Sequence, residues 1–383
     1  MNKDTFCVLP WVQIATNASG FLRVCCNSTP GKNLIKKPDG TPYKIYEDDM
    51  DEAWNSEVYM KIRSQMINGE RPEMCAKCFK EEDVGIRSSR IFWNERWKVD
   101  EQYGETAKLN IKYLDVRLGN LCNLKCRMCN PYASDQWIEE WPLVNPDANK
   151  KELVRLSQLN WMDEPKAWEN LNMLADSVDE IYFTGGEPTV IKEQHRLLDY
   201  CIERDIAKNI ILKYNTNLTN IPKHLLDKWD QFKLVRVNCS IDAIGELDRY
   251  IRYPSDWSTI EKNFHRIRAV RNVRVEIHCT VQMYNILRLT DMIEWCRGNN
   301  VRLFPNVLDR PEYLNIRVLP GHLKEEVALR LSRYTEERIQ GVVDYMMAED
   351  WSNKYDEFIQ FTKRIDESRG QNISNLIPEF SYE

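Results

Sequence analysis

The chain has 383 residues, a net charge of −6 and 43% hydrophobic residues, which is enough for two or three folded units with a real core. No apolar run approaches the roughly 20 residues that a membrane-spanning helix needs, and the first residues lack the long apolar stretch of a signal peptide. We therefore expect a cytoplasmic protein with no membrane partner, and the acidic balance argues against nucleic acid as a partner. In a reducing compartment, the 12 cysteines are more often metal ligands than disulfides.

The first predicted unit spans residues 1–99. A β-hairpin is expected over residues 7–26, because apolar residues alternate on both sides of an Asn-Ala-Ser-Gly turn that ends at Gly20. A helix is predicted near residues 51–68 from its apolar periodicity and the glycine that follows it. These elements predict a small unit of one hairpin and one helix.

Four cysteines of this unit are candidates for one metal site. The hairpin would bring Cys7 and Cys25 onto neighbouring strands, and Cys75 and Cys78 form a C-x2-C pair on one tight loop. Either Cys25 or Cys26 could be the ligand, and the spacing from the glycine of the turn favours Cys25. A structural zinc site fits the same spacing, and buried cysteines without a metal are a further alternative.

The segment 87–107 is basic and aromatic. Aromatic residues among arginines can stack nucleic-acid bases, but such a segment more often packs as an amphipathic element, which is the interpretation we favour. From residue 108 onward, strands and helices alternate, which predicts a parallel sheet with right-handed crossovers. The expected fold over 108–310 is a partial (β/α)6 TIM-type barrel. Its strands are predicted at 112–117, 180–184, 209–214, 233–241, 273–281 and 301–304, and its helices include 189–204, 222–231, 258–269 and 285–298.

Two further segments frame this barrel. Residues 131–179 are acidic and rich in tryptophan, and we expect a long loop that shapes a substrate site. Residues 311–383 are predicted to be a mostly helical extension that could begin with a strand at 313–319. The chain is thus expected to comprise three parts: 1–99, 108–310 and 311–383.

Cys122, Cys126 and Cys129 stand in C-x3-C-x2-C spacing directly after the strand predicted at 112–117. Thiolates this close in sequence converge on one inorganic centre. The next cysteine, Cys201, is far along the chain, so a cubane held here would have one iron without a protein ligand. The alternative is a chance cluster of small buried residues.

This spacing, with the hydrophobic Met128 before the last cysteine, resembles the signature of the radical S-adenosylmethionine (SAM) enzymes. The resemblance continues in the segment E-I-Y-F-T-G-G-E-P at 180–188, which is similar to the family's strand ending in G-G-E-P, and in the strand ends that follow. It implies that the three cysteines bind a [4Fe-4S] cluster. It also implies that SAM is bound by Gly185, Gly186, Glu187, Asn217, Ser240, Asp242, Arg252 and either Thr280 or Val281.

Several of these residues have ordinary alternatives. Glu187 could cap a helix, Arg252 could form a surface ion pair, and Asp242 could stabilise a turn. Leu218 stands where the family has a glycine after Asn217, so the role of Asn217 is open.

The cysteines of the first unit, with Gly20, resemble the twitch auxiliary domain, a shortened relative of the SPASM domain. This resemblance implies a second [4Fe-4S] cluster on Cys7, Cys25, Cys75 and Cys78. Here the domain precedes the barrel, whereas familiar members place it after the barrel.

Polar and apolar residues alternate along the strands predicted at 233–241 and 273–281. Helices cover one face of such a sheet, so the polar residues must face a hydrated lumen. They are candidate substrate contacts, or else an internal ion-pair network. The set comprises Asp115, Arg117, Lys213, Asn215, Arg236, Asn238, Glu276 and His278, of which Glu276 and His278 are candidates for a catalytic acid or base.

The resemblance implies reductive cleavage of SAM to a 5′-deoxyadenosyl radical that abstracts hydrogen from a polar substrate. A peptide is the favoured substrate (cross-link, epimerisation or oxidation), and a sugar or nucleoside-like small molecule is the alternative. A low-potential flavodoxin or ferredoxin is implied as electron donor. A different class, a non-catalytic iron–sulfur or zinc scaffold, is kept as a second hypothesis.

Overall fold

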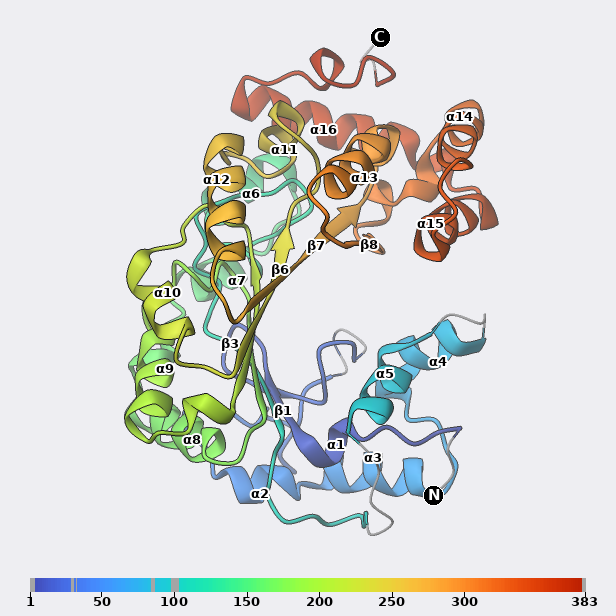
Figure 1. Ribbon diagram of the computed structural model, residues 1–383. Coiled ribbons are helices and arrows are strands. Elements are labelled where there is room, and N and C mark those ends of the chain that lie inside the picture. Colours follow the sequence, from blue (N-terminus) through green and yellow to red (C-terminus); the bar gives the residue numbers. More distant parts are fainter. Residues whose placement is uncertain (1–3, 29–30, 32, 84–86, 98–102, 381–383) are drawn as a thin grey trace. The chain divides into compact units, whose positions relative to one another are not determined.

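The computed structural model describes residues 4–28, 31, 33–83, 87–97 and 103–380 (Figure 1). Its strands form an eight-stranded sheet in the order β2-β1-β3-β4-β5-β6-β7-β8. The strand bounds are β1 Gln13–Thr16, β2 Leu22–Arg23, β3 Tyr113–Arg117, β4 Glu180–Thr184, β5 Ile211–Thr216, β6 Leu234–Ser240, β7 Val273–Val281 and β8 Leu303–Val307.

The sheet is open in the described chain, because β2 and β8 stand at its two ends. β1 and β2 pair antiparallel and form a hairpin, but it is shorter than the predicted 7–26. Residues 9–12 are helical, and neither Cys7 nor Cys25 lies on a strand, so the prediction that the hairpin places them on neighbouring strands was wrong. The pairs β1–β3, β3–β4, β4–β5 and β7–β8 are parallel. Leu114 of β3 and Ile181 of β4 are fully buried, as expected for side chains on the face of the sheet that helices cover. The predicted α/β fold with a partial TIM-type barrel is confirmed, and the N-terminal hairpin extends the six expected strands to eight.

Helices follow the strands in sequence, as predicted. The helices expected at 189–204, 222–231, 258–269 and 285–298 are confirmed with shifted ends. The helix bounds are α1 Leu9–Val12, α2 Met50–Trp54, α3 Glu57–Ile67, α4 Ala76–Asp83, α5 Ser89–Arg96, α6 Trp137–Val144, α7 Lys150–Ser157, α8 Pro165–Ala175, α9 Gln194–Glu203, α10 Lys223–Trp229, α11 Glu246–Ile251, α12 Trp257–Arg268, α13 Leu289–Gly298, α14 Gly321–Leu331, α15 Glu337–Ala348 and α16 Tyr355–Arg369.

Three local predictions were wrong. The helix expected at 51–68 is two helices, α2 and α3, because Ser56 takes an extended conformation and starts the second. The excursion 131–179 is helical rather than a loop, since it contains α6, α7 and α8. The strand considered at 313–319 is two short 3-10 turns, which meet at Asn315; its side chain accepts a hydrogen bond from the Arg317 backbone N–H at 2.9 Å.

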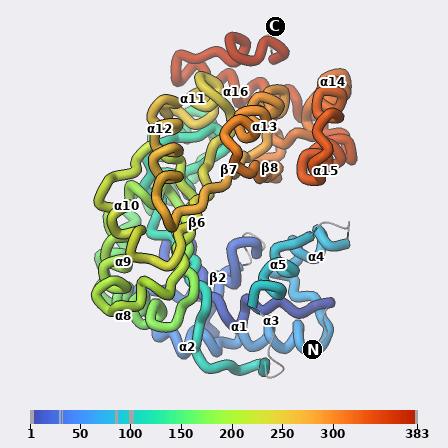
Figure 2. Tube along the Cα trace, in the orientation of Figure 1, coloured from blue at the N-terminus to red at the C-terminus, as the bar shows by residue number. Residues whose placement is uncertain are grey.

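The chain divides into two compact units, which we describe separately. The first comprises Met1–Asn120, Gln158–Tyr214 and Asp227–Val235, and the second comprises Leu121–Ser157, Asn215–Leu226 and Arg236–Glu383. In the first unit α8 and α9 pack side by side, and in the second α14 and α15 do so (Figure 2). The three-part division predicted from the sequence stays a prediction.

The basic aromatic segment contributes a packing helix to the first unit. Trp93 of α5 is buried, and its ring lies 4.7 Å from that of Trp97 and 4.7 Å from that of Tyr113 on β3. The indole therefore faces the protein interior, which supports packing over base stacking for this segment.

The hairpin turn between β1 and β2 depends on Gly20. The Asn17 side chain accepts hydrogen bonds from the backbone N–H groups of Ser19 (2.9 Å) and Phe21 (3.1 Å). Gly20 has a φ of 73°, in the left-handed region that favours glycine.

We expect Gly20→Ala to lower the free energy of unfolding by about 2–5 kcal/mol. The left-handed conformation costs a non-glycine residue about 1–2 kcal/mol, and overpacking costs about 1–3 kcal/mol. The added Cβ would lie 2.8 Å from Tyr46 Cδ1 and 2.9 Å from Trp161 Cδ2. Denaturant unfolding measures the change. The control is Gly341→Ala in α15, where no atom lies within 4 Å of the new Cβ and alanine should add about 0.5–1 kcal/mol of stability. Equal effects of the two substitutions would contradict this account.

Candidate functional site

The thiols of Cys122, Cys126 and Cys129 lie together in the second unit. A hydrogen bond from Cys129 lowers the pKa of Cys126, against the effect of burial. The same hydrogen bond, burial, and the negative charges of Cys126 and Cys122 raise the pKa of Cys129. Cys126 and Cys129 are thus hydrogen-bonded to each other, and the charge of Cys122 acts on Cys129. Among the described residues, no group of three or more His, Cys, Asp or Glu side chains has the arrangement of a single-ion site.

The backbone of this loop is fixed by hydrogen bonds on both sides. Trp137 Nε1 of α6 donates to the Cys126 carbonyl at 2.9 Å. The Lys125 N–H donates to the Tyr253 carbonyl at 2.7 Å, which joins the loop to the segment that follows α11. Because peptide groups on the loop already have partners, the thiols project from a backbone held in one conformation.

The C-terminal helix α16 also holds the loop, which the sequence did not indicate. Arg369 Nη2 donates to the Lys125 carbonyl at 2.9 Å, and its Nε lies 2.9 Å from the Glu140 carboxylate. The fully buried Arg127, which stands between the second and third cysteines, forms an ion pair with Asp366 of α16. The predicted C-terminal extension thus contacts the cysteine loop directly.

Arg252 is the cation nearest the cysteines. Its Nη1 lies 4.0 Å from Cys126 Sγ, and its Nε lies 2.8 Å from Asp242 Oδ2. Burial raises the pKa of Asp242, and Arg252 opposes that shift. Burial lowers the pKa of Arg252, but the negative charges of Asp242, Cys126 and Asp248 outweigh it and raise the pKa overall. Arg252 is thus a buried, charged group between a carboxylate and a thiol, not a surface ion pair.

The end of β5 carries strained backbone next to Asn217. Leu218 has a φ of 61°, where the family pattern has a glycine. Its N–H donates to Thr216 Oγ1 at 3.1 Å, and its carbonyl accepts from Asn263 Nδ2 at 2.7 Å. Asn217 Nδ2 donates to Asn123 Oδ1 of the cysteine loop at 3.0 Å. The leucine therefore keeps the glycine-like conformation, and Asn217 reaches the loop through Asn123.

The ends of β6 and β7 complete this group. The Thr280 N–H donates to Asp242 Oδ1 at 2.7 Å, so Asp242 bridges the strand end and Arg252. Ser240 is the last residue of β6 and is half-buried. Thr280 is half-buried, whereas Val281 is fully buried. Through these two contacts, Asp242 positions Arg252 and the backbone at Thr280.

Gly185, Gly186 and Glu187 lie in the first unit and are described there alone. Gly185 has a φ of 79°, and an added Cβ would lie 3.0 Å from Arg117 Cβ, so a side chain does not fit. Glu187 is buried, and its Oε1 accepts from Thr189 Oγ1 at 2.7 Å and from the Thr189 N–H at 3.1 Å. The carboxylate thus caps the turn at 187–190 and not the following helix α9, which starts at residue 194.

The candidate acid and base residues lie on β7, away from its end. The His278 ring stacks on Phe304 of β8, with 5.0 Å between centroids and 6° between planes. Asn306 Nδ2 lies 3.5 Å from His278 Nδ1. Glu276 is half-buried two residues earlier on the same face.

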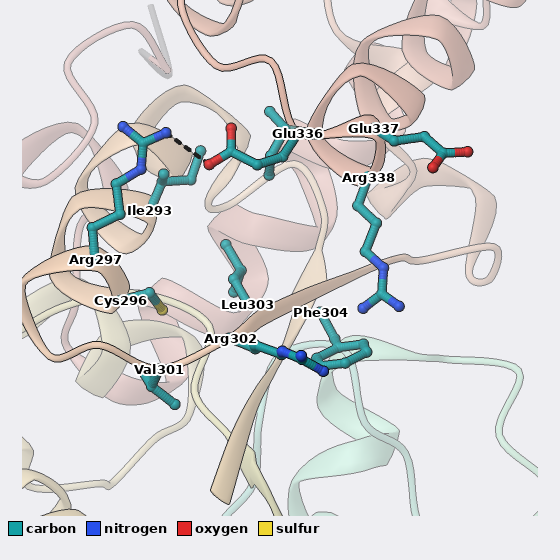
Figure 3. A pocket seen from close by; sticks show the side chains of 11 residues that line it. Ile293, Cys296, Arg297, Val301, Arg302, Leu303, Phe304, Glu336, Glu337 and Arg338 are labelled. Carbon is teal, nitrogen blue, oxygen red and sulfur yellow. Dashed lines mark hydrogen bonds and ion pairs between the residues drawn. The ribbon is translucent and has the colours of Figure 1, made fainter.

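A pocket of about 460 Å³ opens between α13, β8 and α15 (Figure 3). Arg338 lies over the Phe304 ring, 3.9 Å from its centroid, and Arg297 pairs with Glu336 at 2.7 Å. None of the residues predicted for metal, SAM or catalysis lines this pocket.

The first unit gathers four other cysteines. Burial raises the pKa of Cys7, and the charges of Cys75 and Cys78 add to this effect. Burial and the charge of Cys78 raise the pKa of Cys75 to about 12. The pKa of Cys25 is raised by burial and by the charges of Cys26, Cys75 and Cys7. Cys75 thus acts electrostatically on both Cys7 and Cys25, and Cys78 acts on Cys7 and Cys75.

Helix α5 fixes the loop that carries Cys7. Buried Arg90 donates to the Phe6 carbonyl at 2.7 Å, and Asn94 accepts from the Val8 N–H at 2.8 Å. These contacts hold the backbone on both sides of Cys7, as the hydrogen bonds of the second unit do for Cys126.

Residues 116–294 match the model of the Radical SAM superfamily. Molybdenum cofactor biosynthesis protein 1 of Dictyostelium discoideum is 23% identical over 209 residues, which is 53% of this chain and 30% of that protein. A GTP 3′,8-cyclase of Syntrophomonas wolfei is 25% identical over 191 residues, 49% of this chain and 52% of the cyclase. The chain thus spans about a third to a half of the length of these relatives.

Among solved structures, the chain is similar to anSMEcpe with bound AdoMet, at a TM-score of 0.38 and 17% identity, covering 60% of each chain. SuiB of Streptococcus suis bound to the precursor peptide SuiA has a TM-score of 0.38 and 14% identity, covering 83% of this chain and 70% of SuiB. In the described part of this chain, none of the helices is both long and apolar enough to span a membrane.

Proposed function

Since residues 116–294 match the model of the Radical SAM superfamily, we propose that Cys122, Cys126 and Cys129 hold a [4Fe-4S] cluster to which SAM binds. The observation that carries this proposal is the convergence of the three thiols beside Arg252, whose Nη1 lies 4.0 Å from Cys126 Sγ. Three thiolates leave one cluster iron for a non-protein ligand. When bound, the cluster and SAM supply a 5′-deoxyadenosyl radical that abstracts hydrogen from a substrate.

In this proposal, the residues of the chain bind the cluster and SAM and orient them. The fixed loop backbone sets the positions of the three sulfurs, and the Arg252 guanidinium places a positive charge beside the Cys126 thiolate. Its fork is suited to a carboxylate such as that of SAM, and Asp242 orients it through their contact at 2.8 Å. Asn217, Ser240 and Thr280 are the polar groups at neighbouring strand ends that we assign to SAM. The assignment of Gly185, Gly186 and Glu187 to SAM stays a prediction.

For the substrate, we keep the polar class that the sequence predicts, with a peptide as the favoured member. Polar side chains alternate along β5, β6 and β7, and Asn238 Nδ2 donates to Asn215 Oδ1 at 2.8 Å. Such a face offers hydrogen bonds to a polar molecule and little to an apolar one. The similarity to GTP 3′,8-cyclases, at 25% identity over about half of each chain, supports the radical SAM class. It also keeps a nucleoside-like small molecule as the alternative substrate to a peptide.

We further propose that Cys7, Cys25, Cys75 and Cys78 hold an auxiliary [4Fe-4S] cluster. Their electrostatic interactions support this assignment, and four thiolates fill all four positions of a cubane. The thiol of Cys26 has other neighbours, which favours Cys25 as the ligand. A fully ligated cluster is suited to accepting an electron rather than binding substrate.

Anaerobic reconstitution with iron and sulfide tests both proposals. We expect about eight irons per chain, since each cubane holds about four, and formation of 5′-deoxyadenosine from SAM that depends on dithionite. Tightly bound zinc without SAM cleavage would contradict the enzyme hypothesis and favour a scaffold.

We expect Cys75→Ala to lower the iron content to about four per chain, because the auxiliary cluster loses a thiolate. Cleavage of SAM should persist, but substrate turnover should stop. Iron analysis and product chromatography measure these effects. The matched control is Cys201→Ala, a buried cysteine of α9 in the same unit, which should keep both clusters. Unchanged iron content in Cys75→Ala would refute the auxiliary assignment.

A further inference from the structure

A row of side chains crosses five strands of the first unit on one face of the sheet. Residues paired across neighbouring strands point to the same face. The register pairs Arg23 with Ala15, Ala15 with Asp115, Asp115 with Tyr182, and Tyr182 with Lys213. Arg117 lies on the same face, because it follows Asp115 by two residues on β3.

Cations outnumber carboxylates in this row. Arg23 and Asp115 form an ion pair at 3.5 Å, and both are buried. Lys213 Nζ lies over the Tyr182 ring, 4.6 Å from its centroid. Within the described residues, neither Arg117 nor Lys213 has a carboxylate at ion-pair distance. Two positive charges therefore remain without a protein counter-charge in this row.

The arginines also carry donors without acceptors. Nε of Arg23 and Nε of Arg117 are buried and have no hydrogen-bond partner in the described chain, and Nη2 of Arg23 has only the ion pair with Asp115 at 3.5 Å. Buried donors are nearly always paired with protein, water or ligand, so several unpaired ones at a single place indicate a group that is bound there. Both guanidinium groups therefore have N–H groups available for an acceptor.

Asp115 links the cations of this row. Its carboxylate lies 3.5 Å from Arg23 Nη2, and it pairs across the strands with Tyr182, over whose ring Lys213 Nζ lies. Arg117 and Lys213 are half-buried, so this face of the sheet is accessible to solvent.

We propose that Arg23, Arg117 and Lys213 form a subsite for an oxyanion, a phosphate or carboxylate group of the substrate. Guanidinium N–H groups match oxyanions in pairs, and the Lys213 ammonium adds a point charge. Asp115 holds Arg23 in place through their ion pair. The inference depends on the proposed function only in assigning this oxyanion to the substrate.

The test is isothermal titration calorimetry on the reconstituted holoenzyme, with inorganic phosphate and malonate as separate probes. Saturable binding of phosphate alone or malonate alone identifies the kind of oxyanion. We expect Lys213→Met to weaken that binding about tenfold or more, since hydrogen bonds to charged groups are among the strong ones. Methionine keeps an unbranched side chain over Tyr182 and removes only the charge. Arg117→Met should have a similar effect.

The control is Lys208→Met, a neighbouring lysine whose side chain is 61% exposed, which should bind the probe as the wild type does. Binding of neither probe by the wild type, or equal binding by Lys213→Met, would overturn the inference. Formation of 5′-deoxyadenosine by the wild type is measured in parallel. Its absence with intact anion binding counts against the proposed function alone, and its presence without anion binding counts against the subsite alone.

Discussion

Replacing Cys126 with alanine is expected to abolish the formation of 5′-deoxyadenosine that depends on dithionite. Cys126 is the central thiol of the three, hydrogen-bonded to Cys129 and 4.0 Å from Arg252 Nη1. Two thiolates cannot hold a cubane that needs three, so iron content should also fall by about four per chain. Quantifying 5′-deoxyadenosine by chromatography, with iron analysis on the same sample, measures both losses.

Cys296→Ala is the matched control for this substitution. Cys296 lies in α13 of the same unit and is 2% exposed, and among the described residues its thiol hydrogen-bonds only to Met292 Sδ of its own helix, at 3.8 Å. It should cost some stability by leaving a small cavity, but keep SAM cleavage and iron. Cleavage at the wild-type rate in Cys126→Ala would show that the three cysteines do not hold the cluster.

The cysteine loop could be predicted because its geometry is local. Cys122, Cys126 and Cys129 lie within eight residues, so a single tight loop must bring their side chains together. The strand ends were also predictable, since parallel strands place their carboxyl ends at one edge. Asp242 and Thr280, 38 residues apart in the sequence, meet there for this reason.

The long-range supports of the loop could not be predicted. Arg127 pairs with Asp366, which lies 239 residues further along the chain. A charged residue in a cysteine loop does not indicate which residue it pairs with, and a helix rich in charged residues does not indicate which of them are buried. Only the packed structure shows that two of its charged residues face inward.

The preference for Cys25 over Cys26 stays a prediction. Adjacent residues near a strand end point to different sides, but a single sequence does not say which side faces which partner. Burial and the charges of Cys26, Cys75 and Cys7 raise the pKa of Cys25, whereas Arg23, Arg117 and Lys213 oppose the effect of burial and Asp115 on the pKa of Cys26. The register of β1 against β3 shows that the hairpin joins the main sheet. The sequence could not predict this pairing, because a hairpin pattern indicates the turn between its two strands but not which other strand pairs with them.

The second large effect is expected from Asp366→Leu, which should lower the free energy of unfolding by about 3–5 kcal/mol. Removing one partner of a buried ion pair leaves the other charge uncompensated, and Arg127 is fully buried. Asp366 also accepts hydrogen bonds from the Tyr250 hydroxyl and the Ile373 N–H, each at 2.8 Å. Denaturant unfolding of the reconstituted protein measures the loss.

The double variant Arg127→Met with Asp366→Leu separates a charge effect from a packing effect. If the uncompensated guanidinium causes the loss, removing it should restore most of the stability, because apolar pairs often replace buried ion pairs without cost. The double variant would still lack the hydrogen bond from Arg127 Nε to the Tyr250 carbonyl, which is 2.9 Å long and joins the cysteine loop to α11. We therefore expect recovered stability together with slower SAM cleavage. A double variant as unstable as Asp366→Leu alone would show that α16 holds the loop through the hydrogen bonds of Asp366 and not through its charge.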